Sequence, residues 1–338
     1  MPHQFPGCEL SASTVACGMN ELLGWMSDKR MLDIGLCMLV KNEEANVVAS
    51  LRPIVDLFAE VVIVDTGSTD RTRELLSEHF GITALQAELD AAECFALSTQ
   101  RNRGFDLLRT PWLLTLDADE RIDREELKAL MSQPDAGLPA GLFCAWTTDV
   151  GQDALVEDYK LCFFRKGHHH SGLIHDTAQP SLRRSNETAA WAPQVRLRHY
   201  PDLRRQKEKD DWYGLRLRCA MAREPGCLRY PWFSGYMAYR AGRLAEARVA
   251  LERVHRERPE TFPVESLNAS MVLAAIHAQS DRPSQAAAVI DDALAYHRRV
   301  QGDFEVQVNF RMGAWLEQAA QLAASGRYDA IQPYAFGY

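Results

Sequence analysis

Short apolar runs alternate with helix-period segments through the first half of the chain. The runs that predict strands are residues 33–40, 61–64, 82–87 and 112–116. The segments whose apolar residues recur at helical spacing are residues 44–58, 71–80 and 96–108. Strands that are apolar on both faces and joined by helices are typical of a parallel sheet with helices on both sides. We therefore expect an α/β domain here.

The pattern changes after residue 141. Four further runs, at residues 142–148, 160–165, 172–177 and 191–199, read as strands that extend the sheet into a mixed one. Residues 203–222 then form a charged helical segment, and everything from residue 228 onward has helical spacing. These changes predict three parts: an N-terminal extension over residues 1–30 with a helix at 19–26, an α/β domain over 31–202, and an all-α domain over 203–338.

The helical part carries a weak repeat. Gly242, Ala247 and Pro259 follow Gly235 by 7, 12 and 24 residues, and a fainter copy of these offsets begins near Ala274. A third, truncated copy falls around residues 325–328. Small residues at these places match a tetratricopeptide unit of about 34 residues, in which paired helices approach closely. An ordinary helical bundle is the alternative interpretation.

Composition narrows the class of protein. The chain has 338 residues and a net charge of −8, which disfavours a nucleic-acid partner, since such a partner normally requires a basic face. No run of about 18 apolar residues predicts a membrane span, and no leader-like segment is recognised at the start. The eight cysteines form no C-x-x-C pair, which argues against a zinc site. They read as buried free thiols, and we expect a cytoplasmic protein.

Polar clusters follow three of the predicted strands, at residues 41–44, 65–70 and 117–120. Because the carboxyl ends of parallel strands meet at one edge, where such sheets bind ligands, the three clusters are expected to converge there. The last cluster places Asp117 and Asp119 on either side of one alanine. Carboxylate oxygens in this arrangement suit Mg²⁺ or Mn²⁺. A solvated acidic turn is the simpler explanation of such a motif taken alone.

These motifs together resemble a known family. Lys-Asn-Glu-Glu at 41–44, Val-Asp-Thr-Gly-Ser-Thr-Asp at 64–70, Arg-Asn at 101–102 and Leu-Asp-Ala-Asp-Glu at 116–120 have the order and spacing of family-2 glycosyltransferases. Residues 164–165, 172, 174–176 and 199–200 resemble the later signature of a bacterial subgroup. That subgroup includes lipopolysaccharide-core glucosyltransferases and sublancin-type peptide S-glycosyltransferases with C-terminal tetratricopeptide helices. The resemblance implies a GT-A fold for the α/β domain.

The resemblance also implies roles for the nucleotide-binding residues. Asp65 would read the nucleobase, expected to be uracil, through its N3–H, while Asn42 and Glu44 would line the nucleotide pocket. Arg101 would contact the nucleotide or its diphosphate, and Asp117 would touch the ribose or the metal. Each has a structural alternative: Asp65 can cap a helix, Glu44 can serve as a first-turn charge, and Arg101 can lie on a helix surface.

Metal binding is implied for three residues. Asp119 would ligate Mn²⁺ or Mg²⁺ directly, Asp117 would ligate it or lie beside it, and His199 would supply a further ligand or bind the diphosphate. The metal would act as a Lewis acid on the leaving diphosphate. The three adjacent histidines at 168–170 are not expected to chelate together, because neighbours on an extended segment point to opposite faces.

Inversion by single displacement, which the family implies, needs a base to deprotonate the acceptor. Asp176 is the candidate base, although related sequences usually have glutamate there, and Glu120 competes with it because it adjoins the metal cluster. Either residue could instead orient sugar hydroxyls. A thiol acceptor would weaken the need for a base, since thiols ionise near pH 8.5.

The leading hypothesis is an inverting, metal-dependent glycosyltransferase that moves a sugar from a nucleotide donor, expected to be a UDP-sugar, to a soluble acceptor such as a peptide or natural product. The helical repeat would grip the acceptor or form a homodimer. A saccharide-core glycosyltransferase and a degenerate transferase serving as a repeat-based scaffold are the alternatives. A sugar-phosphate nucleotidyltransferase is disfavoured, because such an enzyme would have a glycine-rich loop after the first strand, where this chain has Lys-Asn-Glu-Glu at residues 41–44.

Overall fold

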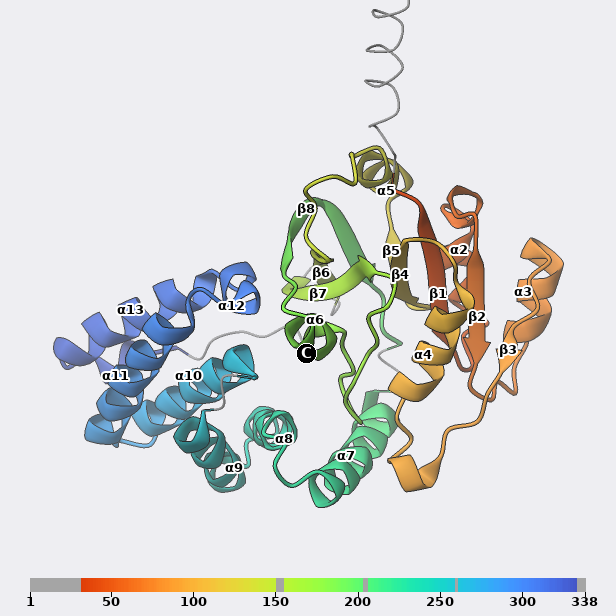
Figure 1. Cartoon of the computed structure of the whole chain (residues 1–338). Coiled ribbons are helices and arrows are strands. Elements are labelled where there is room, and N and C mark those ends of the chain that lie inside the picture. Colours follow the sequence, from red (N-terminus) through yellow and green to blue (C-terminus); the bar gives the residue numbers. More distant parts are fainter. Residues whose placement is uncertain (1–31, 150–154, 203–205, 259–260, 333–338) are drawn as a thin grey trace, which may run out of the picture.

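An eight-stranded mixed sheet forms the centre of the first domain in this computed structural model, which describes residues 32–149, 155–202, 206–258 and 261–332 (Figure 1). The strand order is β3-β2-β1-β4-β7-β6-β8-β5. The strands are β1 (Ile34–Val40), β2 (Val61–Asp65), β3 (Leu85–Gln86), β4 (Trp112–Asp117), β5 (Glu120–Ile122), β6 (Gly141–Asp149), β7 (Leu155–Arg165) and β8 (Ala189–His199). The first four are mutually parallel, whereas β7 runs antiparallel to β4 and to β6.

Helices cover both faces of the sheet, as the continuous apolar runs require. One face packs against α2 (Val47–Leu51), α3 (Thr72–Phe80) and α5 (Arg124–Met131). The other face packs against α4 (Ser98–Leu107), α6 (Gln179–Arg184) and α12 (Phe304–Val308). Helix α4 approaches β1 closely at Gly104, where an added Cβ would lie 2.5 Å from Cys37 Sγ. This glycine therefore sets the height of α4, and with it the position of Arg101, above the sheet.

Most of the predicted elements are confirmed, with three differences. The run at 82–87 is a strand only at Leu85–Gln86, and the segment 44–58 divides into α2 and the short 3-10 helix η1 (Val55–Leu57). The predicted strand at 172–177 is wrong: the segment is a loop closed by one bridge between Ser171 and Thr177. Positive φ angles at Gly172 (113°) and His175 (50°) turn the chain there. The helix predicted at 19–26 lies outside the described residues, and the domain boundaries stay a prediction.

The second part is helical. Its helices are α7 (Gln206–Arg223), α8 (Arg229–Arg240), α9 (Leu244–Glu257), α10 (Pro263–Gln279), α11 (Pro283–Val300) and α13 (Arg311–Ala324), followed by η4 (Tyr328–Ala330). Each helical pair turns at a residue with positive φ, namely Gly242, Asp281 and Gly326. At Gly235 an added Cβ would lie 2.9 Å from the Leu251 side chain, so α8 and α9 pack closely. The repeated turns and the close approach agree with the predicted tetratricopeptide-like organisation.

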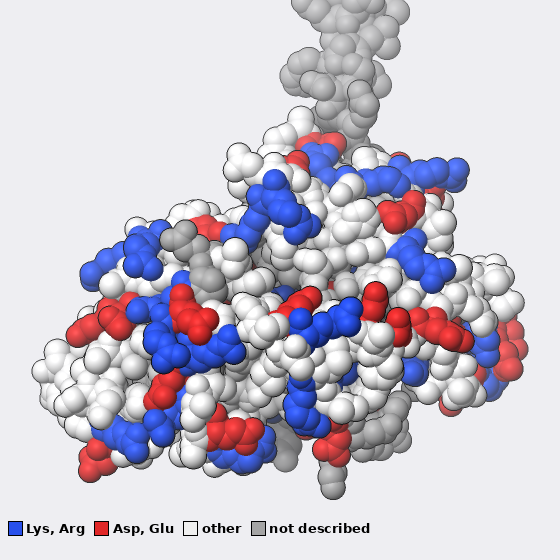
Figure 2. Space-filling model, turned by 60° about the horizontal axis from the view of Figure 1, so that its bottom comes forward, with Lys and Arg blue, Asp and Glu red and all other residues white. Residues whose placement is uncertain are grey.

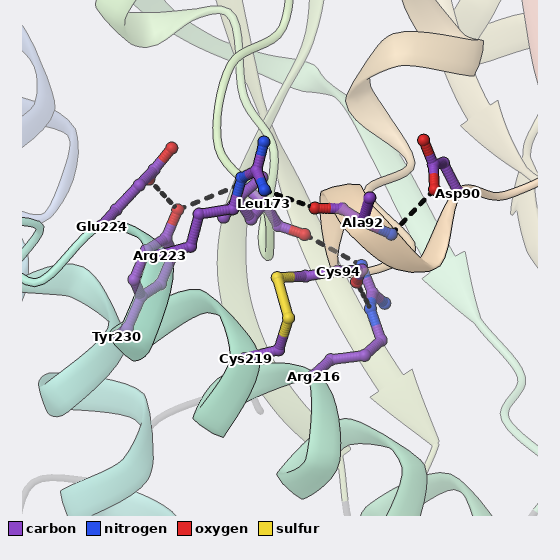
Figure 3. Close-up of a disulfide and its surroundings, with 9 residues drawn as sticks. All are labelled: Asp90, Ala92, Cys94, Leu173, Arg216, Cys219, Arg223, Glu224 and Tyr230. Carbon is purple, nitrogen blue, oxygen red and sulfur yellow. Dashed lines mark hydrogen bonds between the residues drawn. A yellow bond between two sulfur atoms is a disulfide. The ribbon is translucent and has the colours of Figure 1, made fainter.

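A disulfide between Cys94 and Cys219 ties the two parts together (Figure 3). Cys94 ends the short helix η2 (Ala91–Glu93) that precedes α4, and Cys219 lies on α7. Arg216 and Arg223, also on α7, donate hydrogen bonds to the carbonyls of Cys94 and Ala92. The prediction that all eight cysteines are free thiols is therefore wrong for this pair, because residues 125 positions apart in sequence are brought together only by the fold.

Charges on the surface are mixed. Figure 2 shows lysine and arginine interspersed with aspartate and glutamate across the face that it draws, so neither sign forms a continuous patch over the described residues there. None of the helices described here combines the length and the apolar character that crossing a bilayer requires.

Candidate functional site

The three polar clusters converge at the carboxyl edge of the parallel strands, as predicted. Strand β1 lies between β2 and β4, with Val40 opposite Asp65 and Leu39 opposite Asp117. Because neighbouring strands are about 4.8 Å apart, Asp65 and Asp117 flank the end of β1 at a separation of roughly 10 Å. The edge therefore presents one carboxylate on each side of a central strand.

Asp65 has one carboxylate oxygen engaged and one open. Its Oδ1 accepts hydrogen bonds from the backbone N–H groups of Gly67 and Ser68, both at 2.7 Å, in the turn after β2, and it does not cap α3, whose N-cap is Arg71. The side chain is buried, and its Oδ2 has no hydrogen-bond donor among the described residues. The nearest cation to Oδ2 is Arg73 Nε at 3.6 Å. A buried acceptor without a donor is costly unless a ligand supplies one.

Asn42 and Glu44 hold the loop that follows β2. Asn42 Oδ1 accepts a hydrogen bond from Thr69 N at 2.8 Å, and Glu44 Oε2 accepts one from Arg71 N at 3.0 Å. Asn42 itself has a φ of 57°, and its own N–H donates to Ser68 Oγ. Both side chains therefore fix the backbone of the loop that follows Asp65, and neither they nor Asp65 line the cavity beside the end of β4 that is described below.

A buried arginine and a partly buried lysine neutralise the carboxylates at the end of β4. Arg101, which is 6 % exposed, donates from Nη1 to Asp117 Oδ1 at 3.1 Å and from Nε to Asp176 Oδ2 at 3.0 Å. Lys160 Nζ lies 2.7 Å from Asp117 Oδ2 and 2.6 Å from Glu120 Oε1. The result is an alternating chain of charges, in the order Asp176, Arg101, Asp117, Lys160 and Glu120. This chain explains how an apolar strand can end in several carboxylates.

The cations shift the protonation of these carboxylates. Burial by itself would raise the pKa of Asp117, but Lys160 and Arg101 outweigh it and hold the pKa well below its usual range. Burial opposes ionisation of Asp176 in the same way, and Arg101 and a hydrogen bond from His170 again lower the pKa. Burial dominates at Glu120, whose pKa is raised despite Lys160. Asp117 and Asp176 are thus fixed anions.

Asp119 and His199 form a separate pair beside this chain. Asp119 Oδ2 lies 3.3 Å from His199 Nε2, and the other ring nitrogen of His199 lies 3.2 Å from Thr148 Oγ1. The His199 ring stacks on Trp146 with centroids 4.7 Å apart, which fixes its orientation. A carboxylate oxygen and an imidazole nitrogen that face each other suit a divalent cation. No set of three or more such ligands occurs among the described residues.

A cavity of about 410 Å³ lies in front of these groups. Its lining brings together six of the predicted site residues: Arg101, Asp117, Asp119, Glu120, Asp176 and His199. It also contains Asp158 on β7, for which no ion pair is found in the described part of the chain and whose Oδ1 accepts a hydrogen bond from Tyr159 N. Burial raises the pKa of Asp158 to about 7.

Sequence reasoning missed Lys160, Asp158 and His170. Lys160 had a usable signal, since it opens an apolar run, and a lysine on a buried strand requires an anionic partner. His170 is buried, lies 2.7 Å from Asp176 Oδ2 through Nδ1, and so helps to orient that carboxylate. Its neighbours at 168 and 169 pair with Glu187 and Asp106 instead, which agrees with the expectation that the three histidines do not chelate together.

Comparison with known proteins supports a family for this site. Residues 36–171 match the model of glycosyl transferase family 2. A tetratricopeptide repeat-containing protein of Synechococcus elongatus is 34 % identical over 109 residues, which cover 31 % of this chain and 26 % of that protein. An uncharacterised glycosyltransferase of Rickettsia bellii is 26 % identical over 100 residues, covering 30 % of this chain and 32 % of that one. The matched segments thus span a third or less of these curated relatives.

Solved structures with a related arrangement include S. aureus TarS residues 1–349 in complex with UDP-GlcNAc, at 12 % identity and a TM-score of 0.44, covering 88 % of this chain and 93 % of that one. GalNAc-T7 with UDP, GalNAc and Mn²⁺ has 13 % identity and a TM-score of 0.38, covering 52 % of this chain and 45 % of that one. Likenesses at this level do not by themselves establish a shared function. The family model, which spans the motifs at 41–44, 64–70, 101–102 and 116–120, shows that residues 36–171 form a glycosyl transferase family 2 domain.

Proposed function

We propose that the protein transfers a sugar from a UDP-sugar to an acceptor, by single displacement with inversion. The observation that carries this proposal is the position of Asp65 and Asp117 on either side of the β1 end, within a family 2 domain. A roughly 10 Å span suits a nucleotide that lies across the sheet edge, with its base at one carboxylate and its diphosphate toward the other.

Asp65 is proposed to bind the nucleobase. Its buried Oδ2 lacks a donor among the described residues, and uracil N3–H would supply one. Asn42 and Glu44 would act indirectly, because their side chains hold the loop around Asp65. Arg101 and Lys160 would face the diphosphate, where two fixed cations stabilise the charge that develops on the leaving group.

Asp119 and His199 are the residues proposed to hold Mn²⁺ or Mg²⁺. Asp117 is less suited to direct ligation, because each of its oxygens already accepts a hydrogen bond from a cation. We therefore propose that Asp117 positions Arg101 and Lys160, and that it approaches the ribose or the metal only if one of these bonds opens. When bound, the metal would act as a Lewis acid on the diphosphate.

The choice of base follows from the electrostatics. Asp176 is held as an anion by Arg101 and His170, and a carboxylate with a lowered pKa accepts a proton poorly. Glu120 is buried, and both of its oxygens accept hydrogen bonds. Asp158 lines the same cavity and has a pKa of about 7, which suits a general base near neutral pH. We propose Asp158 as the base and Asp176 as the residue that positions Arg101.

A turnover screen tests the proposed function. Purified protein is incubated with a panel of nucleotide sugars, with and without Mn²⁺, and release of the nucleoside diphosphate is measured. UDP-sugars with Mn²⁺ are expected to react fastest, and the unfolding temperature should rise with UDP plus Mn²⁺. A chain that serves only as a scaffold would show neither response. The anomeric configuration of the product, read by NMR, tests inversion.

A further inference from the structure

A second cavity, of about 310 Å³, lies between the sheet domain and the helical domain. Strands β6 and β7 supply one wall, which includes Phe143. Helices α8, α10 and α12 supply the other, which includes Phe233 and Val264. It is lined in part by the same residues as the cavity of the active site: Asp158, Tyr159, His175, Gln179 and Arg229. A molecule bound at the active site can therefore extend into this second cavity, which we name the interdomain cavity.

Carboxylates outnumber cations in the lining of the interdomain cavity. Among the described residues, the lining holds four carboxylates, Glu157, Asp158, Glu265 and Glu305, and two arginines, Arg229 and Arg311. Glu305 also pairs with Arg183 at 2.8 Å, but that arginine pairs with Asp303 as well, so it adds no net positive charge. The ionised lining would thus carry a net negative charge.

Glu265 gives an independent indication of a missing partner. The side chain is only 5 % exposed, and its Oε1 pairs with Arg229 Nε at 2.5 Å. Its Oε2 is buried and has no hydrogen-bond donor among the described residues. A buried carboxylate oxygen without a donor is unfavourable, and a cationic donor within the cavity would remove that cost.

Repulsion among the carboxylates of the interdomain cavity is also consistent with a missing cation. Burial first, and the nearby Glu265 second, raise the pKa of Glu305 to about 8. Burial and Glu265 also act in the same direction on Asp158. A bound cation would relieve both effects and allow these groups to ionise.

We propose that the interdomain cavity binds a cationic group of the acceptor, an ammonium or guanidinium on an apolar stem. The charged end would donate to Glu265 Oε2 and Glu305, and the stem would lie along Phe143, Phe233 and Val264. The acceptor atom that receives the sugar would then lie near Asp158, where the two cavities meet. This inference rests on the proposed function, and it narrows the acceptor to a basic peptide or an amine-bearing compound.

Binding of a charged and a neutral probe tests the inference. The full chain is titrated with Nα-acetyl-arginine amide and with Nα-acetyl-citrulline amide, which has nearly the same shape but no charge, and binding is followed by ligand-observed NMR. We expect saturable binding of the arginine probe and roughly tenfold weaker binding of the citrulline probe, because the neutral ureido group can donate hydrogen bonds but carries no charge to pair with the carboxylates. Equal binding of the two probes would overturn the inference.

Three variants locate the binding. Glu305→Gln removes one charge while Arg183 keeps Asp303 as a partner, and it should weaken the arginine probe by roughly tenfold. Glu265→Gln tests the open oxygen, and its folding is checked by circular dichroism. Glu246→Gln on α9 is the matched control, since that carboxylate is exposed and pairs only with Arg243. Unchanged binding in Glu305→Gln, or equal loss in the control, would refute the site.

The proposed function can fail separately. Release of UDP from a UDP-sugar without any acceptor is measured on the wild-type protein in parallel. Turnover without discrimination between the probes would reject the interdomain site alone. Probe discrimination without turnover on any nucleotide sugar would reject the transferase and leave a cation-binding cavity.

Discussion

The chain of charges around Asp117 and the interdomain cavity treat carboxylates in opposite ways. Around Asp117, each carboxylate touches Arg101 or Lys160, and the pKa values of Asp117 and Asp176 fall. In the interdomain cavity, Asp158 pairs with no cation in the described part of the chain, and burial raises the pKa values of Asp158 and Glu305. Both regions are buried, so burial alone does not explain the difference.

The difference lies in how much counter-charge the protein itself supplies: Asp117 contacts two cations, Glu305 contacts an arginine shared with Asp303, and Asp158 has no ion pair among the described residues. Beside Arg101 and Lys160, Asp117 and Asp176 are permanent anions that hold these cations in place, whereas burial still raises the pKa of Glu120. Where no cation is built in, a carboxylate can take up a proton or bind a positively charged ligand. Carboxylates neutralised by dedicated cations are thus suited to positioning, whereas Asp158 is suited to proton transfer and Glu265, through its open Oε2, to recognition.

The largest effect is expected at the proposed metal pair. Asp119→Ala removes one of two facing ligands and should lower turnover by at least roughly 10³-fold, because a centre that stabilises the leaving diphosphate is lost. The charge chain does not include Asp119, so the fold and the unfolding temperature in the absence of ligand should stay close to the wild type. Glu125→Ala, at an exposed position on α5, is the control. Wild-type turnover in Asp119→Ala would remove the metal pair from the proposal.

The second largest effect is expected in the pH profile of turnover, which distinguishes Asp158 from Asp176 as the general base. If Asp158 is the base, kcat/KM of the wild type should rise with pH through about 7, as the carboxylate forms. Asp158→Asn should lower kcat by about 10²-fold and abolish this limb of the pH profile. Asp176→Asn frees Arg101 and should raise KM while it keeps the limb. Persistence of the limb in Asp158→Asn would return the role of base to Asp176 or Glu120.

The sequence was sufficient to predict the parallel strands and the sheet edge at which Asp65 and Asp117 lie. Apolar runs that end in polar clusters predicted both the parallel strands and their common edge, because strand direction alone brings their carboxyl ends together. The convergence of Asp65 and Asp117 followed from this rule. The length of the apolar run could not show that residues 172–177 form a loop, since the positive φ angles of Gly172 and His175 override it.

The ion pairs of the charge chain and the lining of the interdomain cavity depend on contacts between residues distant in sequence. Arg101 on α4 meets Asp176 in the loop after β7 only in the folded sheet domain, and Glu265 on α10 faces the same cavity as Asp158 only once the helical domain packs beside β7. The same holds for the disulfide of Cys94 and Cys219. A sequence motif identifies the residues at the end of one strand, but the pKa of each residue depends on every charge that the fold brings near that residue.

A smaller effect is expected at the disulfide that links the sheet domain to α7. Reduction of the Cys94–Cys219 disulfide, or Cys219→Ser, should lower the free energy of unfolding by about 2–4 kcal/mol, since the bond closes a long loop. Hydrogen exchange should rise mainly in α7 and in residues 171–177, which Arg216 links through Leu173 O at 3.0 Å. Strands β1 and β4 should keep their protection. Cys227→Ser, at a free cysteine, is the control.

The smallest effect is the pH dependence of stability, for which the two regions have opposite signs. Asp117 and Asp176 have lowered pKa values, so their contribution is present above the unfolded pKa near 4 and is lost as the pH falls. Glu305 has a raised pKa of about 8, so the folded chain binds the extra proton, and its contribution is lost as the pH rises from about 4 through 8.

Urea unfolding at pH 5 and pH 9 measures the contribution of Glu305. The charges that act on Glu305 are Glu265 and Asp303, which favour its protonation, and Arg183 and Arg229, which oppose it. The wild type should lose stability between the two pH values, and Glu305→Gln should lose less, because glutamine cannot ionise. Glu246→Gln should follow the wild type. Equal losses in wild type and Glu305→Gln would mean that the arginines already balance this carboxylate, and the contrast between the two regions would then rest on Asp158 alone.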